Sequence, residues 1–180
     1  MEHNLNRGEE EKFLHAGNVL REFRHIHTFM FDVDGVMTNS ELLITESGEL
    51  LRKMSVRDGF AIKRAIEEKF RIIVITGGTS KGTIERLKAL GIKDVIFGAN
   101  NKLKHYEALL DQYHLDEDGI LYMGDDLPDY EIMRRVGLAC CPFDATPEIM
   151  SISKYVSPMK GGEGCVRDVI EKVMKLNGVW

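Results

Sequence analysis

Aspartate residues occur at two places in the sequence where a short apolar run ends. Asp32 and Asp34 follow one such run, and Asp125 and Asp126 follow another. Carboxylates that are brought close together repel one another unless a cation compensates for their charge. Oxygen ligands of this kind suit Mg²⁺, which binds through one or two carboxylates and keeps several waters. The pattern therefore predicts a magnesium site, provided that both runs end at the same place in the fold.

Two further residues could hold a phosphoryl group beside such a cation. Thr76 follows the apolar run Ile72–Ile75, and Lys102 begins a stretch with helical periodicity. A hydroxyl can donate to one phosphate oxygen, and an ammonium can neutralise another. Asp32 then takes the position of a nucleophile, and Asp34 that of a proton donor to the leaving oxygen. A single aspartate after a strand is usually a turn residue, so the prediction depends on the whole set.

The elements that must position these residues are short apolar runs separated by helix-period stretches. Each run is rich in branched or aromatic residues, which is typical of strands buried on both faces. We expect strands at 28–31, 72–75, 95–97, 120–123 and 138–141, and helices at about 59–69, 80–90, 101–113 and 129–136. This alternation predicts an α/β fold with a doubly wound, Rossmann-like parallel sheet. In such a sheet, ligands bind beyond the carboxyl ends of the strands.

One segment, residues 37–56, interrupts the alternation directly after the first strand. Two extended stretches joined by a turn at Ser47-Gly48 predict a β-hairpin insert, which is too small to be a domain. We expect it to serve as a flap or an oligomer contact. Residues 1–25 form a predicted N-terminal helical extension, with an amphipathic helix over 9–23, and residues 26–180 form the main domain.

Composition excludes several classes of protein. The 180 residues are 43% hydrophobic and 29% charged, an ordinary globular balance. A net charge of −5 argues against nucleic-acid binding, and no apolar run approaches the roughly 20 residues that cross a bilayer. The N-terminus lacks a signal-peptide pattern. The three cysteines are too few for a disulfide framework, so we expect buried, reduced thiols in a cytoplasmic protein.

The sequences around the aspartates also resemble the motifs of a known protein superfamily. Residues 31–38, FDVDGVMT, resemble the DxDGVxT signature of the haloacid dehalogenase superfamily of phosphohydrolases. Thr76, Lys102 and the run GDDLPD at 124–129 match the remaining three motifs of that superfamily in the same order. The resemblance covers about residues 26–175 and is highly specific as a set of four motifs.

This resemblance implies a magnesium-dependent phosphatase that works through an aspartyl-phosphate on Asp32. Mg²⁺ would be held by the carboxylates of Asp32 and Asp125 and by the backbone carbonyl of Asp34. Asp126 and Asp129 would lie behind these ligands or orient the motif lysine.

The lack of a large cap, together with SVRDG at 55–59, resembles a small capless branch of the superfamily. That branch is typified by 3-deoxy-D-manno-octulosonate 8-phosphate phosphatase and includes nonulosonate 9-phosphate phosphatases. It implies a keto-sugar acid phosphate as substrate, a role in lipopolysaccharide biosynthesis, and a homotetramer whose neighbouring subunits cover each site. The residues expected to contact substrate are Asp34, Gly77 and Lys102, together with Ser55, Val56, Arg57, Asp58, Gly59, Lys63 and Arg86, which would reach it from a neighbouring subunit or along the pocket rim. The tail at 161–164 would reach an adjoining site.

Two departures from the branch bear on the substrate. Gly78 stands where the branch typically has an arginine, and Glu163 stands where the octulosonate enzymes often have one. Both changes remove positive charge near an anionic substrate. Lys63, Lys81 or Lys160 could offset the loss, or the substrate could differ.

Other functions remain open at this point. A phospho-acceptor signalling domain also combines an aspartate, an acidic pair, a threonine and a lysine, but its acidic pair precedes the acceptor in the chain. A non-catalytic interaction subunit would have no need of the complete set of five residues (Asp32, Asp34, Thr76, Lys102 and Asp125). A phosphomutase normally has a larger cap than the hairpin at 37–56.

Overall fold

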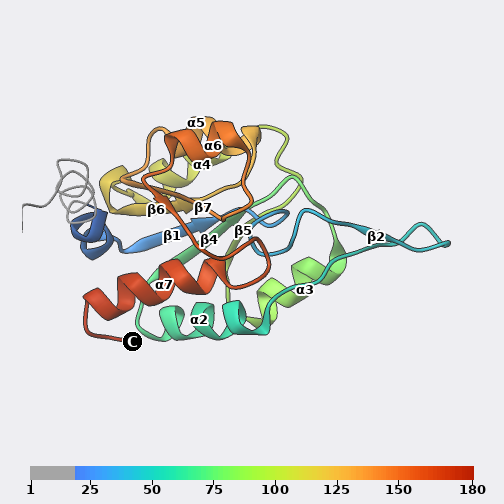
Figure 1. Ribbon diagram of the computed structural model, residues 1–180, viewed down its shortest axis with the longest axis horizontal. Coiled ribbons are helices and arrows are strands. Elements are labelled where there is room, and N and C mark those ends of the chain that lie inside the picture. The colour runs from blue at the N-terminus through green and yellow to red at the C-terminus, as the bar shows by residue number, and fades with distance from the viewer. Residues whose placement is uncertain (1–18) are drawn as a thin grey trace, which may run out of the picture.

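Parallel strands form the sheet in the order β5-β4-β1-β6-β7-β8 in the computed structural model, which describes residues 19–180 (Figure 1). The strands are β1 (Thr28–Phe31), β4 (Arg71–Ile75), β5 (Asp94–Ile96), β6 (Ile120–Met123), β7 (Leu138–Cys141) and β8 (Tyr155–Val156). The helices are α2 (Val56–Glu67), α3 (Lys81–Ala89), α4 (Lys102–Tyr113), α5 (Tyr130–Met133), α6 (Pro147–Ile152) and α7 (Cys165–Leu176), with 3-10 turns η1 (Glu117–Gly119) and η2 (Leu127–Asp129). The predicted doubly wound α/β fold is confirmed.

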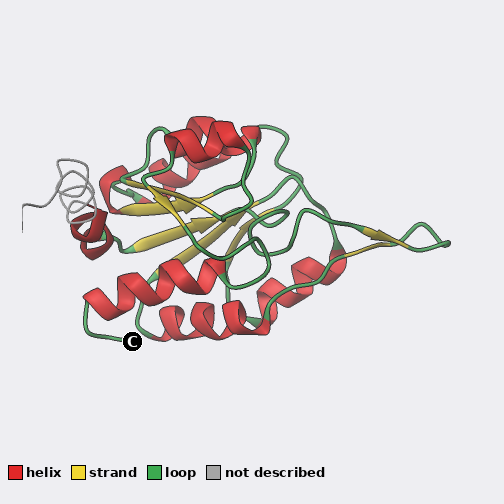
Figure 2. Cartoon of the chain, in the orientation of Figure 1, coloured by secondary structure: helices red, strands yellow, loops and turns green. Residues whose placement is uncertain are grey.

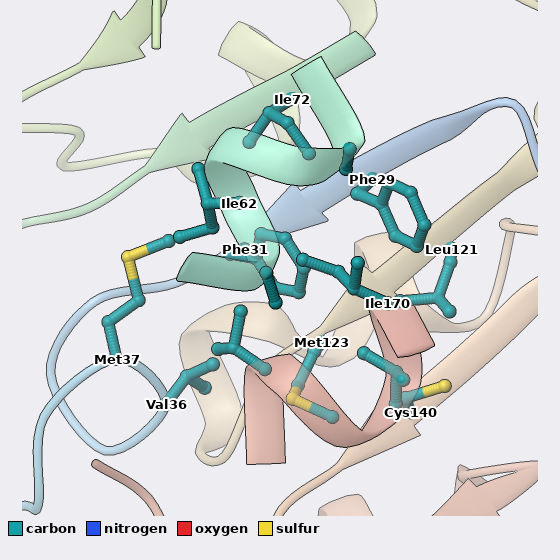
Figure 3. Close-up of a cluster of buried hydrophobic side chains, with 14 of the residues drawn as sticks. Phe29, Phe31, Val36, Met37, Ile62, Ile72, Leu121, Met123, Cys140 and Ile170 are labelled. Atoms are coloured by element: carbon teal, nitrogen blue, oxygen red, sulfur yellow. The ribbon is translucent and has the colours of Figure 1, made fainter. Parts of the chain in front are cut away.

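Helices cover both faces of the sheet, as Figure 2 shows. On one face, α2, α3 and α7 pack on Phe29 and Phe31 of the central strand, and Figure 3 shows Ile62 of α2 and Ile170 of α7 in this cluster. On the other face, α4, α5 and α6 pack on Met30 and its neighbours. Successive side chains of a strand point to opposite faces. The continuous apolar runs noted in the sequence are therefore explained by a sheet that is buried on both sides.

Side-chain caps fix where the helices begin. The hydroxyl of Ser55 accepts from the backbone of Asp58 at the start of α2, and Ser80 does the same for Thr83 in α3. The amide oxygen of Asn101 accepts from the backbone N–H of Lys104. Each bond satisfies an N–H that has no partner within the helix. The cap at Asn101 makes Lys102 the first residue of α4, at the end of the helix that faces the carboxyl edge of the sheet.

The predicted hairpin is present but shorter than expected. Its paired strands are β2 (Leu43–Ile44) and β3 (Leu50–Leu51), and it extends away from the sheet (Figure 1). The extended segment ends before Val56 because Ser55 caps α2 there, so the expected strand boundary at Val56 was wrong. Leu43 and Ile44 are 67% and 66% exposed, which leaves the hairpin without a core of its own.

Other differences from the predicted elements lie near the N-terminus and in the part of the chain after β6. Most of the predicted helix over 9–23 lies outside the described residues, and residues 19–25 are helical. The strand β8 and the helices α6 and α7 were not predicted. The predicted helix over 129–136 is shorter, because η2 occupies its start and α5 ends at Met133.

The three cysteines are buried free thiols, as predicted. Cys140 belongs to the core beneath α2 and α7, whereas Cys141 belongs to the core beneath α4, α5 and α6. Adjacent residues of β7 thus reach different layers of the fold. Among residues 19–180, no helix combines the length and the apolar character needed to cross a bilayer.

Candidate active site

The central strand brings the predicted acidic residues together. β1 pairs with β4 on one side and with β6 on the other, and Phe31 is in register with Val74 and Met123. Asp32 therefore leaves the sheet beside the ends of both neighbouring strands, and its backbone N–H donates to the carbonyl of Met123 at 3.1 Å. A cavity of about 460 Å³ opens at this edge. It is lined by Asp32, Asp34, Asn39, Ser40, Glu41, Leu42, Thr76, Gly77, Gly78, Ala99, Asn100, Lys102, Asp125, Asp126, Pro128 and Asp129.

Three buried carboxylates share one space at the base of the cavity. One oxygen from each of Asp32, Asp125 and Asp129 lies within 4.8 Å of the others. The Oδ1 atom of Asp125 is buried without a hydrogen-bond partner. An unpartnered carboxylate oxygen is costly to bury unless a cation or a donor binds there. The arrangement therefore fits a small, hard cation.

Lys102 is the cation that the protein itself supplies. Its Nζ lies 2.9 Å from an oxygen of Asp32 and 2.7 Å from Oδ1 of Asp129. The hydroxyl of Tyr122, a buried residue of β6, donates to the same Asp129 oxygen at 2.6 Å. Burial alone would lower the pKa of Lys102, but the charges of Asp129 and Asp32 outweigh it, and the pKa is raised. Lys102 is therefore a fixed positive charge at physiological pH.

One lysine does not compensate for all of the negative charge. Burial, followed by the charge of Asp129, raises the pKa of Asp32 to about 7, although Lys102 opposes the shift. Burial and the charges of Asp32 and Asp129 raise the pKa of Asp125 to about 8. Both raised pKa values indicate that the negative charge of the carboxylates is incompletely compensated, so a bound cation would stabilise their ionised forms. Oxygen-only donors at an open cavity, where the ion could keep some of its waters, suit Mg²⁺.

Asp34 occupies a different environment from Asp32. Its carboxylate is 39% exposed, lines the cavity, and receives two hydrogen bonds from Arg52, at 2.5 Å from Nε and 3.0 Å from Nη2. Arg52 follows β3 of the hairpin and was not among the predicted site residues. The sequence offered one signal: two adjacent cationic residues, Arg52 and Lys53, come directly after the apolar Leu50-Leu51.

The remaining motif residues lie at the same edge. Thr76 is buried and its hydroxyl accepts from the backbone N–H of Gly78 at 3.1 Å, while Gly77 lines the cavity. Asp126 is exposed and its carboxylate caps η2 by accepting from the backbone of Leu127. The residue that orients Lys102 is therefore Asp129, and Asp126 makes no contact with that lysine.

The residues predicted from the start of α2 are not brought to this cavity. Ser55 caps the helix, and Val56, Arg57 and Lys63 are exposed on it. Gly59 is buried against the guanidinium of Arg86, which lines a second cavity of about 700 Å³ between the hairpin and α3.

Asp58, also predicted to contact substrate, is only 3% exposed. Its Oδ1 accepts from the backbone N–H of Arg167 at 2.8 Å. Gly164, the residue before α7, provides no side-chain cap, so Asp58 takes over that function from another helix. The structure therefore gives Asp58 a role in joining α2 to α7, because its carboxylate is buried, bonds to the backbone of α7 and does not line the cavity.

The glycine tail packs on its own chain rather than extending outward. The backbone N–H of Gly162 donates to the carbonyl of Val36 at 2.9 Å. A Cβ on Gly161 would lie 2.0 Å from the carbonyl oxygen of Gly35. This close approach explains the glycines, and it fixes the loop that carries Asp34.

Comparisons with known proteins identify the family of the chain. A family model described as haloacid dehalogenase-like hydrolase matches residues 94–170. Over 163 residues, the chain is 32% identical to the 3-deoxy-D-manno-octulosonate 8-phosphate phosphatase of Escherichia coli K12, covering 91% of this chain and 87% of that protein. The crystal structure of the Yersinia pestis phosphatase of the same name has a TM-score of 0.87 at 33% identity, covering 89% of this chain and 87% of that one.

A further similar structure carries ligands. The Moraxella catarrhalis 3-deoxy-D-manno-octulosonate 8-phosphate phosphatase, in complex with a magnesium ion, a phosphate ion and a KDO molecule, has a TM-score of 0.85 at 28% identity. The alignment covers 89% of this chain and 92% of that one. The chain therefore belongs to the haloacid dehalogenase superfamily of phosphoric monoester hydrolases, in the branch that contains the 3-deoxy-D-manno-octulosonate 8-phosphate phosphatases.

Proposed function

We propose that the protein is a magnesium-dependent phosphatase that hydrolyses a keto-sugar acid phosphate, with 3-deoxy-D-manno-octulosonate 8-phosphate as the foremost candidate. The observation that carries the proposal is the joint position of Asp32, Asp125 and Lys102 at one cavity. A signalling domain or a non-catalytic subunit is not favoured, because the similar proteins over the full domain are named as phosphatases.

In the proposed reaction, an oxygen of Asp32 attacks phosphorus while the bond between phosphorus and the leaving oxygen breaks. Asp34 gives a proton to that leaving oxygen, so a neutral alcohol departs. Water then attacks the aspartyl-phosphate as Asp34 accepts its proton, and the bond between Asp32 and phosphorus breaks. The ammonium of Lys102, 2.9 Å from Asp32, and the hydroxyl of Thr76 are placed to bind the phosphate oxygens.

Magnesium is proposed as the cofactor because the donor set fits it. The carboxylates of Asp32 and Asp125 would hold the ion, with the backbone carbonyl of Asp34, and Asp129 lies beside them. When bound, Mg²⁺ supplies positive charge that stabilises both the ionised carboxylates and the phosphate oxygens. The Moraxella catarrhalis structure, whose complex includes a magnesium ion and a phosphate ion, supports this choice.

The substrate class is proposed from the relatives and from the cavity. Its walls include Asn39, Ser40 and Asn100, which are neutral polar groups suited to the hydroxyls of a sugar. Nonulosonate 9-phosphates are the alternative, because Gly78 leaves the site without the arginine that the branch typically carries there. Of the substrate contacts predicted from the sequence, Asp34, Gly77 and Lys102 line the cavity, whereas Ser55–Gly59, Lys63 and Arg86 do not.

Phosphate release with Mg²⁺ tests the function and the substrate together. We expect multiple turnovers and a kcat/KM for octulosonate 8-phosphate at least about 100-fold above that for nonulosonate 9-phosphates, since polar pockets discriminate strongly. The reverse ratio would identify the alternative. Asp32→Asn should lose turnover by about 1,000-fold or more. Retention of phosphate release by Asp32→Asn would contradict the nucleophile.

We further propose a homotetramer joined through the hairpins. Exposed apolar side chains cover the hairpin: Leu42, Leu43, Ile44, Leu50 and Leu51. Such a patch marks an interaction surface. Light scattering should give the mass of a tetramer for the wild type and a lower mass for Leu43→Ser/Ile44→Ser, whereas Leu20→Ser, an exposed leucine away from the hairpin, should not change it. A tetrameric double variant would refute this interface.

The same proposal places the protein in the cytoplasm, in lipopolysaccharide biosynthesis. Buried free thiols at Cys140, Cys141 and Cys165 support a reducing compartment. The proposed role in making a sugar acid is supported by the name of the similar Escherichia coli protein, a 3-deoxy-D-manno-octulosonate 8-phosphate phosphatase.

A further inference from the structure

Arg52 and Asp34 form a two-point ion pair at the catalytic cavity. Nε of Arg52 lies 2.5 Å from Oδ1 of Asp34, and Nη2 lies 3.0 Å from Oδ2. Two parallel bonds from a rigid guanidinium fix the plane of a carboxylate as well as its position. The pair joins the hairpin to the loop after β1, across 18 residues of sequence.

The burial of the two side chains is unequal. The Arg52 side chain is 9% exposed, whereas that of Asp34 is 39% exposed. Asp34 lines the catalytic cavity, but Arg52 lines the neighbouring cavity between the hairpin and α3. Arg52 itself is not among the residues that line the catalytic cavity. A pair with one nearly buried partner is held more firmly than a surface ion pair.

Gly78 provides the space for this arrangement. A Cβ on Gly78 would lie 3.2 Å from Oδ2 of Asp34 and 3.6 Å from Nη2 of Arg52. Any larger side chain at position 78 would therefore have to share this space with the guanidinium. The glycine at position 78 and the arginine at position 52 are two parts of one local arrangement.

We propose that Arg52 is a positioning residue: it holds the Asp34 carboxyl, which is protonated when it donates to the leaving oxygen and ionised when it accepts a proton from water, in the orientation that both transfers require. This inference rests on the proposed function, in which Asp34 is the proton donor. Because Arg52 bonds to Asp34 and does not itself line the catalytic cavity, we expect its effect to pass through Asp34 rather than through substrate. The hairpin thereby becomes part of the catalytic apparatus of its own subunit.

The dependence of kcat/KM on the leaving group tests this role. This ratio reports the steps up to phosphoryl transfer to the enzyme, and only a poor leaving group needs the proton. With Mg²⁺ present, Arg52→Met should lower kcat/KM for octulosonate 8-phosphate by about 10- to 100-fold, but for p-nitrophenyl phosphate by less than about 3-fold. Arg52→Lys should recover part of the loss, because an ammonium holds the carboxylate less rigidly. Lys53→Met, the adjacent exposed cation, is the matched control and should change neither value.

A double-variant cycle with Asp34→Asn separates positioning from direct binding. Asp34→Asn alone should show the same leaving-group dependence with a larger loss, about 100- to 10,000-fold for the sugar phosphate. If Arg52 acts through Asp34, then Asp34→Asn/Arg52→Met should lose no more than Asp34→Asn. A double loss equal to the product of the single losses, or an equal loss for both substrates, would overturn the inference. Thermal melting of each variant checks folding, and Arg52→Lys carries the comparison if Arg52→Met does not fold.

The two proposals fail in different ways. If the wild type releases no phosphate from either ester, or if Asp34→Asn shows no leaving-group dependence, the proposed function is wrong and this inference falls with it. If the wild type and Asp34→Asn behave as expected and the Arg52 variants do not, only the role of Arg52 is wrong.

Discussion

Gly35 lies against the carboxyl group of Asp125, so closely that a Cβ on Gly35 would be 2.0 Å from Oδ2. Gly35 also has a φ of +94°, a conformation that side-chain-bearing residues rarely adopt. Gly35, the glycine of the motif after β1, therefore leaves the space that the Asp125 carboxylate, after β6, occupies. The two halves of the candidate metal site fit together only because position 35 has no side chain.

Gly35→Ala should consequently damage the site and the fold together. We expect a loss of about 2–4 kcal/mol in the free energy of unfolding, from backbone strain and from the clash, and a weaker affinity for Mg²⁺. Urea unfolding and calorimetric Mg²⁺ titration measure these effects. Gly48→Ala is the matched control, because Gly48 has a φ of +81° but nothing within 4 Å of its Cβ position. Equal losses of stability in both variants would contradict the contact with Asp125.

Magnesium affinity should depend on pH. The pKa of Asp32 is raised to about 7 and that of Asp125 to about 8, so ion binding must release protons at neutral pH. We expect the apparent Kd to fall by about 10-fold or more between pH 6 and pH 8.5. Calorimetry in buffers of different ionisation enthalpy counts the protons released. An affinity independent of pH would contradict the raised pKa values.

The same shifts predict how pH acts on the metal-free protein. A carboxyl with a raised pKa in the folded state stays protonated there while the unfolded chain has already ionised, at the ordinary aspartate pKa of 3.8. The unfolded state then binds fewer protons, so these two groups make unfolding easier as the pH rises from about 4 to about 8. Thermal melting in chelator should show this trend, and saturating Mg²⁺ should remove it.

Lys102→Met should destabilise the protein as well as inactivate it. The substitution leaves the charges of Asp32 and Asp129 buried without their shared cation, which typically costs about 3–5 kcal/mol. Mg²⁺ should recover part of the stability. Lys104→Met, an exposed lysine in the same helix, should be neutral by denaturant unfolding. A stable Lys102→Met protein in chelator would disprove the proposed energetic role of the bridge.

Asp58 offers a test of a purely structural residue. Asp58→Ala removes the acceptor for the backbone N–H of Arg167 and should lower the free energy of unfolding by about 1–3 kcal/mol. Asp58→Asn keeps an acceptor oxygen and should cost less. Burial raises the pKa of Asp58, which means that the folded protein disfavours its ionised form. The negative charge therefore adds little to the stability of the fold. Phosphate release by the folded Asp58→Asn variant should stay near the wild-type value; a large loss of activity would restore Asp58 to the substrate contacts.

The positions of the motif residues at one sheet edge could be predicted because each depends only on the strand that directly precedes it in the sequence. An apolar run followed by an aspartate places that aspartate at a carboxyl end, and β1 at the centre of the sheet brings Asp32 next to Asp125. The helix α7 was missed although Val166, Val169, Ile170 and Val173 follow a helical period.

The missed contacts depend on how the chain folds back on itself. Arg52 reaches Asp34 only because the hairpin turns over the loop after β1. Asp58 is buried by a helix that starts more than 100 residues later, so its SVRDG motif alone could not distinguish a cap from a substrate contact.

The adjacent thiols of β7 provide an internal reporter of motion. Burial raises the pKa of both Cys140 and Cys141, so neither should react with an alkylating reagent while β7 stays in the sheet. Because the two thiols sit in separate layers, modification at both positions requires the strand itself to detach rather than one helix to lift. The rate at which both cysteines are alkylated would therefore measure how often β7 detaches from the sheet. β7 pairs with β6, and β6 leads to Asp125.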